Sequence, residues 1–230
     1  MPLDLTDLPA LADAYAAKSP QDILATALQE FSPQVGIAFS GAEDVVLIDM
    51  AVKLGVPFTV FSLDTGRLHP ETYQFIEKVR THYGIPIETV LPQSEAVQKL
   101  VREKGLFSFY QDGHTECCNI RKVEPLNRAL EGKRAWVTGV RRADGPTRAN
   151  TPIVSYDINR NLVKINPLAA WTDDDMSLYA EINDLPANPL TERGYPSIGC
   201  WPCTRPVAEG EDRRGGRWAG NAKTECGLHV

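Results

Sequence analysis

Short apolar runs and amphipathic stretches alternate along the first part of the chain. The runs at 35–39, 58–63 and 87–91 are bounded by turn residues, which predicts buried strands. The first two are followed by stretches with helical spacing of apolar positions, at 45–54 and from 67 to about 83. This alternation predicts an α/β fold, a doubly wound and mostly parallel sheet with helices on both faces.

The pattern on either side of these units completes the predicted fold. Residues 4–30 have helical spacing and contain a new helix start, for which Ser19 is the expected cap. A further strand is expected at 136–140 and a hairpin at 153–165. The three aspartates after Thr172 are typical of a capped helix start rather than of a metal site.

The last part of the chain has a different character. Residues 209–230 contain few large apolar side chains and many Gly, Arg and Glu residues, so they cannot pack a core of their own. We therefore predict one α/β domain over 1–208 and a flexible C-terminal tail over 209–230. The tail carries Cys226, and the basic residues Lys223 and His229 at three positions on either side would favour its reactive thiolate form.

Composition narrows the classes of function. The chain has 230 residues and a formal net charge of −6, which argues against non-specific binding to nucleic acid or to anionic membranes. No apolar run approaches a membrane span, and the acidic N-terminus does not resemble a signal peptide. These features predict a cytoplasmic protein with no membrane partner.

Polar residues follow the predicted strands at the edge where ligands bind in open α/β sheets. The small-residue loop after the first strand, residues 40–44, could present backbone N–H groups to an anion, although it lacks the spacing and the lysine of a Walker A loop. Arg141, Arg142 and Arg148 follow the strand at 136–140. Because arginine donates paired hydrogen bonds to phosphate and sulfate, this grouping favours an anion site.

Four further cysteines form an adjacent pair, Cys117 and Cys118, and a distant Cys-x-x-Cys, Cys200 and Cys203. Four thiolates can hold either a [4Fe–4S] cluster or a tetrahedral zinc ion, and the spacing does not separate the two. The adjacent pair suits a cluster if it begins a helix. The alternatives are a thioredoxin-type redox pair and buried free thiols.

Five segments together resemble the assimilatory adenylyl-sulfate reductases, which belong to the adenine-nucleotide α-hydrolase-like fold. They are Ser-Gly-Ala-Glu-Asp at 40–44, Leu-Asp-Thr-Gly-Arg-Leu-His-Pro-Glu-Thr-Tyr at 63–73, Cys-Cys-Asn-Ile-Arg-Lys-Val-Glu-Pro-Leu at 117–126, Cys-Trp-Pro-Cys-Thr-Arg-Pro at 200–206 and Glu-Cys-Gly-Leu-His at 225–229. The resemblance implies a [4Fe–4S] cluster on the four paired cysteines and a catalytic nucleophile at Cys226. The substrate-binding residues it implies are Ser40, Gly41, Glu43, Asp44, Leu63, Lys122, Gly139, Arg148, Arg214, Arg217 and His229.

By the same resemblance, the expected reaction is the reduction of adenylyl sulfate to sulfite and AMP, through an S-sulfocysteine on Cys226, in assimilatory sulfate reduction. Thioredoxin or glutaredoxin would be the reductant. Phosphoadenylyl sulfate, or both nucleotides, is the alternative substrate. Less favoured alternatives are an ATP pyrophosphatase of the same fold and a non-catalytic metal-binding redox sensor. A homo-oligomer is compatible with the sequence.

Overall fold

A six-stranded sheet forms the centre of the computed structural model, which describes residues 8–108, 114–221 and 223–229. The strands are β1 (Val35–Ala38), β2 (Val60–Leu63), β3 (Ile87–Val90), β4 (Ala135–Val137), β5 (Val154–Asp157) and β6 (Leu162–Ile165). Their order is β3-β2-β1-β4-β6-β5, and every neighbouring pair is parallel except β5 and β6. The predicted mostly parallel sheet is confirmed, and so is the hairpin.

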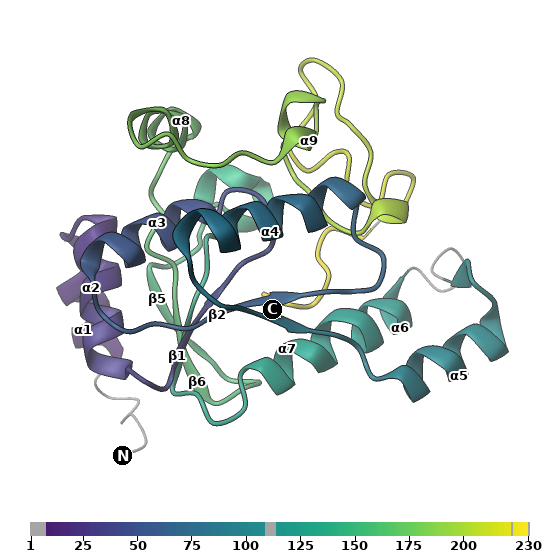
Figure 1. The fold of residues 1–230 in the computed structure, drawn as a ribbon, viewed down its shortest axis with the longest axis horizontal. Helices are drawn as coiled ribbons and strands as arrows, with labels where there is room; N and C mark the ends of the chain where they lie inside the picture. Colours follow the sequence, from purple (N-terminus) through teal and green to yellow (C-terminus); the bar gives the residue numbers. More distant parts are fainter. Residues whose placement is uncertain (1–7, 109–113, 222, 230) are drawn as a thin grey trace.

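Helices surround this sheet (Figure 1). The α-helices are α1 (Leu8–Ala16), α2 (Pro20–Phe31), α3 (Val45–Leu54), α4 (Pro70–Tyr83), α5 (Ser94–Lys104), α6 (Thr115–Cys118), α7 (Glu124–Ala129), α8 (Asp173–Ile182) and α9 (Pro189–Glu192). Between α6 and α7 the chain continues as a π-helical segment, η3 (Asn119–Val123). Short 3-10 turns lie at Arg142–Asp144, Pro146–Arg148 and Trp201–Cys203.

Alternate residues of the strands divide the core between the two faces of the sheet. On β4, Ala135 and Val137 pack in the larger cluster with α2, α3 and α4, whereas Trp136 points to the other face. There Trp136 packs with Phe61 of β2 and Leu126 of α7. Helices therefore cover both faces, as the strand–helix alternation predicts.

The predicted helix caps are present. The Ser19 side chain accepts a hydrogen bond from the backbone N–H of Asp22, and Thr172 forms a reciprocal capping box with Asp175. The aspartates after Thr172 thus begin α8. No helix in the described part of the chain is long and apolar enough to span a membrane.

The strand order reverses between β1 and β4, which pair side by side in parallel. Loops that leave two such strands diverge to opposite faces, and the crevice between them is the usual ligand site of an open α/β sheet. The strand expected at 136–140 ends early, at Val137. The Thr138 hydroxyl donates to Asn166 Oδ1 at 2.5 Å and accepts from the Val140 N–H, and this turns the chain toward the crevice.

Candidate active site

A cavity of about 190 Å³ opens at the carboxyl edge of β1, β2 and β4. Its lining includes residues of the C-terminal segment, between 213 and 229, together with residues that follow β1 early in the chain. The predicted site residues that line it are Ser40, Glu43, Asp44, Leu63, Lys122, Gly139, Arg148, Arg214, Arg217, Cys226 and His229. The structure therefore brings together nearly all of the residues that the resemblance selected.

The loop after β1 is closed on itself. Asp44 accepts from the Ser40 backbone N–H at 2.8 Å and from the Ser40 hydroxyl. Burial raises the pKa of Asp44 above its ordinary value, and the two hydrogen bonds from Ser40 partly oppose that shift. The Ser40 N–H is thus already used, which differs from the expectation that this loop offers it to an anion.

Gly41 is the predicted residue that lies outside the cavity lining. Its φ of +96° is in the left-handed region that favours glycine, and a Cβ there would lie 2.7 Å from Thr72 Cγ2. Its carbonyl accepts from Asn188 Nδ2 at 2.8 Å. In this structure Gly41 shapes the turn behind the site rather than facing the cavity.

Gly139, two residues after the end of β4, allows the chain to pass close to Asp44 in the loop after β1. A Cβ at position 139 would lie 2.1 Å from Asp44 Oδ1, so any side chain would displace the buried carboxylate. The resemblance implies a nucleotide in this cavity, so we expect Gly139→Ala to weaken AMP binding by about 10-fold or more, because Asp44 and its loop would have to shift. Isothermal titration calorimetry measures this. Gly84→Ala is the control for lost stability, since its φ of +63° strains an alanine there although no atom lies within 4 Å of the added Cβ. Equal losses of AMP affinity in both variants would contradict the prediction.

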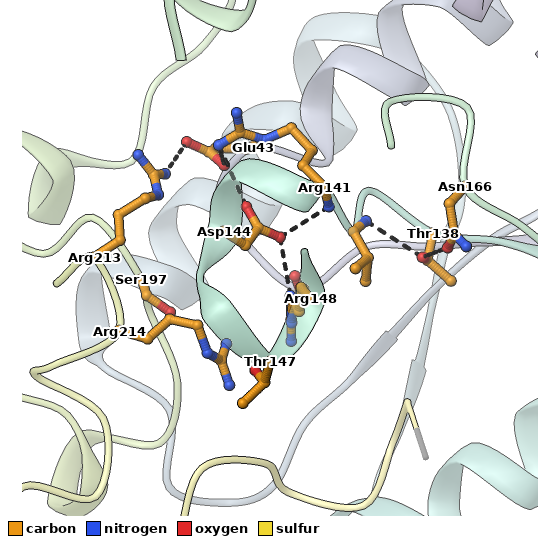
Figure 2. A network of polar contacts seen from close by, with 12 residues as sticks. Glu43, Thr138, Arg141, Asp144, Thr147, Arg148, Asn166, Ser197, Arg213 and Arg214 are labelled. Carbon is orange, nitrogen blue, oxygen red and sulfur yellow. Dashed lines mark hydrogen bonds and ion pairs between the residues drawn. The ribbon is translucent and has the colours of Figure 1, made fainter. Parts of the chain in front are cut away.

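Arg141 is a buried residue at the centre of an ion network (Figure 2). Its side chain has no exposed surface and pairs with Glu43 at 3.0 Å, Asp173 at 2.8 Å and Asp144 at 3.4 Å. Glu43 also pairs with Arg213 of the C-terminal segment. Of the arginines expected to form an anion site, Arg141 is therefore committed to structure, because carboxylates already surround it.

Arg148 and Arg214 both face Glu225 in the C-terminal segment. Glu225 lies 3.1 Å from Arg148 Nε and 3.1 Å from Arg214 Nη2. Arg148 also pairs with Asp144 at 3.0 Å (Figure 2). Two arginines predicted to bind the substrate anion thus hold a carboxylate of the chain itself.

Cys226 is 8% exposed and lines the cavity next to Lys122 and Arg217. Burial alone would raise the pKa of Cys226, but the positive charges of Lys122 and Arg217 outweigh it and lower the pKa below its ordinary value. The lowered pKa agrees with the sequence prediction. However, the cations that lower the pKa of Cys226 are Lys122 and Arg217, rather than the predicted Lys223 and His229.

His229 stacks on Trp136, with ring centroids 5.6 Å apart and planes 5° from parallel. Burial, followed by the nearby charge of Lys164 and Arg148, holds the pKa of His229 well below its usual value, so this ring is neutral. Within the described residues, its buried Nδ1 has no hydrogen-bond partner, and the same holds for Arg217 Nε. Both residues line the cavity, and a bound anionic ligand would satisfy such atoms.

The four paired cysteines converge beside this cavity. Cys117 and Cys118 lie in α6, which continues into η3, so the adjacent pair stands near the start of a helical stretch as expected. Together with Cys200 and Cys203 they line a second, smaller cavity. The Cys200 thiol donates to Thr65 Oγ1 at 3.2 Å. Burial raises the pKa of the Cys203 thiol to about 12.

These residues fit a negatively charged group. Arg121 and Lys122 are 6% and 7% exposed and line the same small cavity as the thiols, and Arg121 Nε has no hydrogen-bond partner among the described residues. No three His, Cys, Asp or Glu side chains of the described chain are grouped closely enough to ligate one metal ion. The four thiols line this one cavity, and four thiolates can hold either a [4Fe–4S] cluster or a tetrahedral zinc ion.

Some charged residues that form ion pairs around this cavity were not among the predicted site residues. Arg213 lines the cavity and pairs with Glu43. Asp144 also lines the cavity and pairs with Arg141 and Arg148. Glu225 pairs with Arg148 and Arg214. Glu225 belongs to the Glu-Cys-Gly-Leu-His segment, so its place beside the nucleophile could have been expected. Nothing in the local sequence separates Arg213 from its neighbour Arg214.

The sheet topology, with a crevice at the point where the strand order reverses, defines a doubly wound α/β protein. More specifically, residues 34–206 match the phosphoadenosine phosphosulfate reductase domain, and the chain belongs to this family of oxidoreductases that act on a sulfur group. It is 54% identical over 232 residues to adenosine 5'-phosphosulfate reductase of Pseudomonas aeruginosa (strain LESB58), covering 97% of this chain and 87% of that protein. It is 52% identical to the probable 5'-adenylylsulfate reductase 1, chloroplastic, of Oryza sativa subsp. japonica, covering 97% of this chain and 49% of that protein.

A solved structure supports the same assignment. The crystal structure of phosphoadenylyl-sulfate (PAPS) reductase from Candida auris, in a phosphate complex, matches with a TM-score of 0.77 and 27% identity, over 89% of this chain and 99% of that chain. The Candida glabrata FMN adenylyltransferase complex with FAD and inorganic pyrophosphate matches with a TM-score of 0.57 at 15% identity, over 87% of this chain and 73% of that chain, which shows a shared fold only.

Proposed function

We propose that this protein reduces adenylyl sulfate to sulfite and AMP in assimilatory sulfate reduction. The observation that carries the proposal is the position of Cys226, which faces a cavity at the sheet edge between Lys122 and Arg217. A thiol with a lowered pKa that faces a cavity lined by Lys122, Arg214 and Arg217 is suited to attack an anionic sulfuryl group. The names of the bacterial and plant relatives point to the same substrate.

In the first step, the Cys226 thiolate attacks the sulfur atom of the sulfate group. A bond forms between Sγ and this sulfur, the bond from the sulfur to the phosphate oxygen breaks, and its electron pair leaves with AMP. Lys122 and Arg217 neutralise the non-bridging oxygens, while Arg148 and Arg214 stabilise the charge that develops on the leaving phosphate. The product on the protein is an S-sulfocysteine.

In the second step, a dithiol reductant of the thioredoxin or glutaredoxin class attacks Sγ of this adduct. Sulfite leaves with the electron pair of the sulfur–sulfur bond, and a mixed disulfide remains. The second thiol of the reductant then attacks that disulfide and regenerates Cys226. The reductant supplies the two electrons. We propose that the C-terminal tail opens for this step, because Cys226 is buried in the closed position.

We further propose that Cys117, Cys118, Cys200 and Cys203 hold a [4Fe–4S] cluster. When bound, the cluster would supply structural cross-linking and a fixed charge beside the site, and no electron of the reaction is assigned to it. Lys122 lines both cavities, so its ammonium group can neutralise charge on either side.

Phosphoadenylyl sulfate, alone or together with adenylyl sulfate, is the second candidate substrate, which the Candida auris match favours. A sulfite-release assay with each nucleotide on anaerobically purified protein decides between them. We expect sulfite release from adenylyl sulfate in the presence of thioredoxin, and no release of pyrophosphate from ATP. Inertness toward both sulfated nucleotides, or pyrophosphate released from ATP, would contradict the proposal.

Glu225 provides a separate test of the anion site. We expect Glu225→Gln to tighten AMP binding by about threefold to tenfold, because the carboxylate that pairs with Arg148 and Arg214 is removed. Isothermal titration calorimetry at low ionic strength measures the change. Glu211→Gln is the matched control, since Glu211 also pairs with an arginine, Arg205, but neither residue lines the cavity. Weaker AMP binding in Glu225→Gln would show that Glu225 does not compete with the ligand.

A further inference from the structure

Cys226 is fixed by contacts on both sides of it in the chain. On the N-terminal side, Glu225 pairs with Arg148 and Arg214, which are also predicted ligands of the substrate anion. That attachment is weakened whenever a phosphate or sulfate group takes the arginines. A second attachment that does not depend on these arginines is therefore needed to keep the thiol in place during attack.

The residues after Cys226 supply such an attachment. The Leu228 side chain packs against the cluster of Phe61, Leu126 and Trp136. The carbonyl oxygen of Leu228 accepts from Arg160 Nη1 at 3.4 Å. These contacts join the end of the chain to β2, α7, β4 and the β5–β6 hairpin.

Arg160 is held in place before it meets the tail. Its Nη1 lies 2.7 Å from Asp157 Oδ2, and its Nε donates to Asn127 Oδ1 at 2.9 Å. Its guanidinium also lies over Trp136, 5.9 Å from the ring centroid. The side chain is 7% exposed, so this is an ordered group rather than a mobile surface arginine.

The geometry points to Arg160 as a positioning residue for Cys226, acting through the Leu228 carbonyl. This rests on the function proposed above. Arg160 does not itself line the substrate cavity, and it reaches the lining only through Leu228 and Trp136. Its removal leaves the cations of the cavity in place, so nucleotide affinity should be kept while the thiol loses its fixed position. The attachment at Arg160 persists when the substrate anion displaces Glu225, because it does not use Arg148 or Arg214.

The test compares Arg160→Ala and Arg160→Lys with the wild type in single turnover with adenylyl sulfate. Formation of the S-sulfocysteine, followed by intact mass, should slow by about 10- to 100-fold in Arg160→Ala, with partial rescue in Arg160→Lys. The dissociation constant for AMP should stay within about twofold of wild type. Arg80→Ala, which removes a surface ion pair with Glu77, is the matched control and should change neither quantity.

A second measurement separates this inference from the proposed function. Alkylation of Cys226 by iodoacetamide, read by peptide mass spectrometry, should be faster in Arg160→Ala than in wild type or Arg80→Ala. If the wild type forms no adduct, the proposed function fails, and the alkylation rates still decide whether Arg160 fixes the tail. The inference would be overturned if Arg160→Ala showed the same alkylation rate and the same rate of adduct formation as the wild type. It would also be overturned if the variant lost AMP affinity by the same factor as it lost the rate of adduct formation.

Discussion

Cys226→Ser is expected to lower sulfite formation by at least about 10³-fold, because a serine hydroxyl cannot supply the thiolate that attacks sulfur. The variant should still bind AMP, since the cations of the cavity are unchanged. Sulfite release and intact mass together measure the result, and the mass gain of one SO₃ group should be absent from the variant.

The same variant distinguishes an enzyme from a sensor. A non-catalytic sensor that responds through its metal centre would behave alike with serine or cysteine at position 226. Sulfite release near the wild-type rate from Cys226→Ser would contradict the assignment of the nucleophile. Wild-type iron content in the variant is the control that its loss of activity does not come from a lost cluster.

Cys200→Ser is expected to reduce bound iron from about four atoms per chain to less than one, since a [4Fe–4S] cluster needs all four thiolates. The buried cations Arg121 and Lys122 would then face no compensating charge, so we also expect a lower melting temperature and little activity. Iron and zinc analysis, together with the visible absorption spectrum, measures the outcome after anaerobic purification.

Cys226→Ser serves as the matched control for this experiment as well, because Cys226 lies outside the set of four. Stoichiometric zinc with no iron in the wild type would show that the thiols hold a single ion. Unchanged iron in Cys200→Ser would show that Cys200 is not a ligand.

The fold was largely readable from the sequence because its signals are local. Apolar runs, Ser19 and Thr172 fix strands and helix starts within a few residues, and parallel strands bring their following loops to one edge. The convergence of the early loop at 40–44 with the late Cys226 came from motif resemblance, since no local signal relates positions so far apart.

What the sequence did not provide is the pairing of charges. Arg141 and Arg148 look equivalent along the chain, but Arg141 is enclosed by three carboxylates whereas Arg148 lines the cavity. Arg160 belongs to none of the recognised sequence motifs. Its contact with Leu228 exists only because the β5–β6 hairpin lies next to residues 226–229 in the fold. The mobility expected for residues 209–230 stays a prediction. In the structure, residues from the described parts of this segment, 209–221 and 223–229, line the cavity, and Trp218 is only 2% exposed.

The burial of Cys226 also bears on oxidative damage. Thiols with a lowered pKa are the ones that peroxides convert to sulfenic and then sulfinic acids, and the reaction requires access. With its tail closed, the protein keeps its most reactive sulfur 8% exposed, behind Glu225 and Leu228. The rate of inactivation by peroxide should therefore follow the fraction of time that the tail is open. A ligand that holds the tail closed would protect Cys226 from oxidation by blocking access to it.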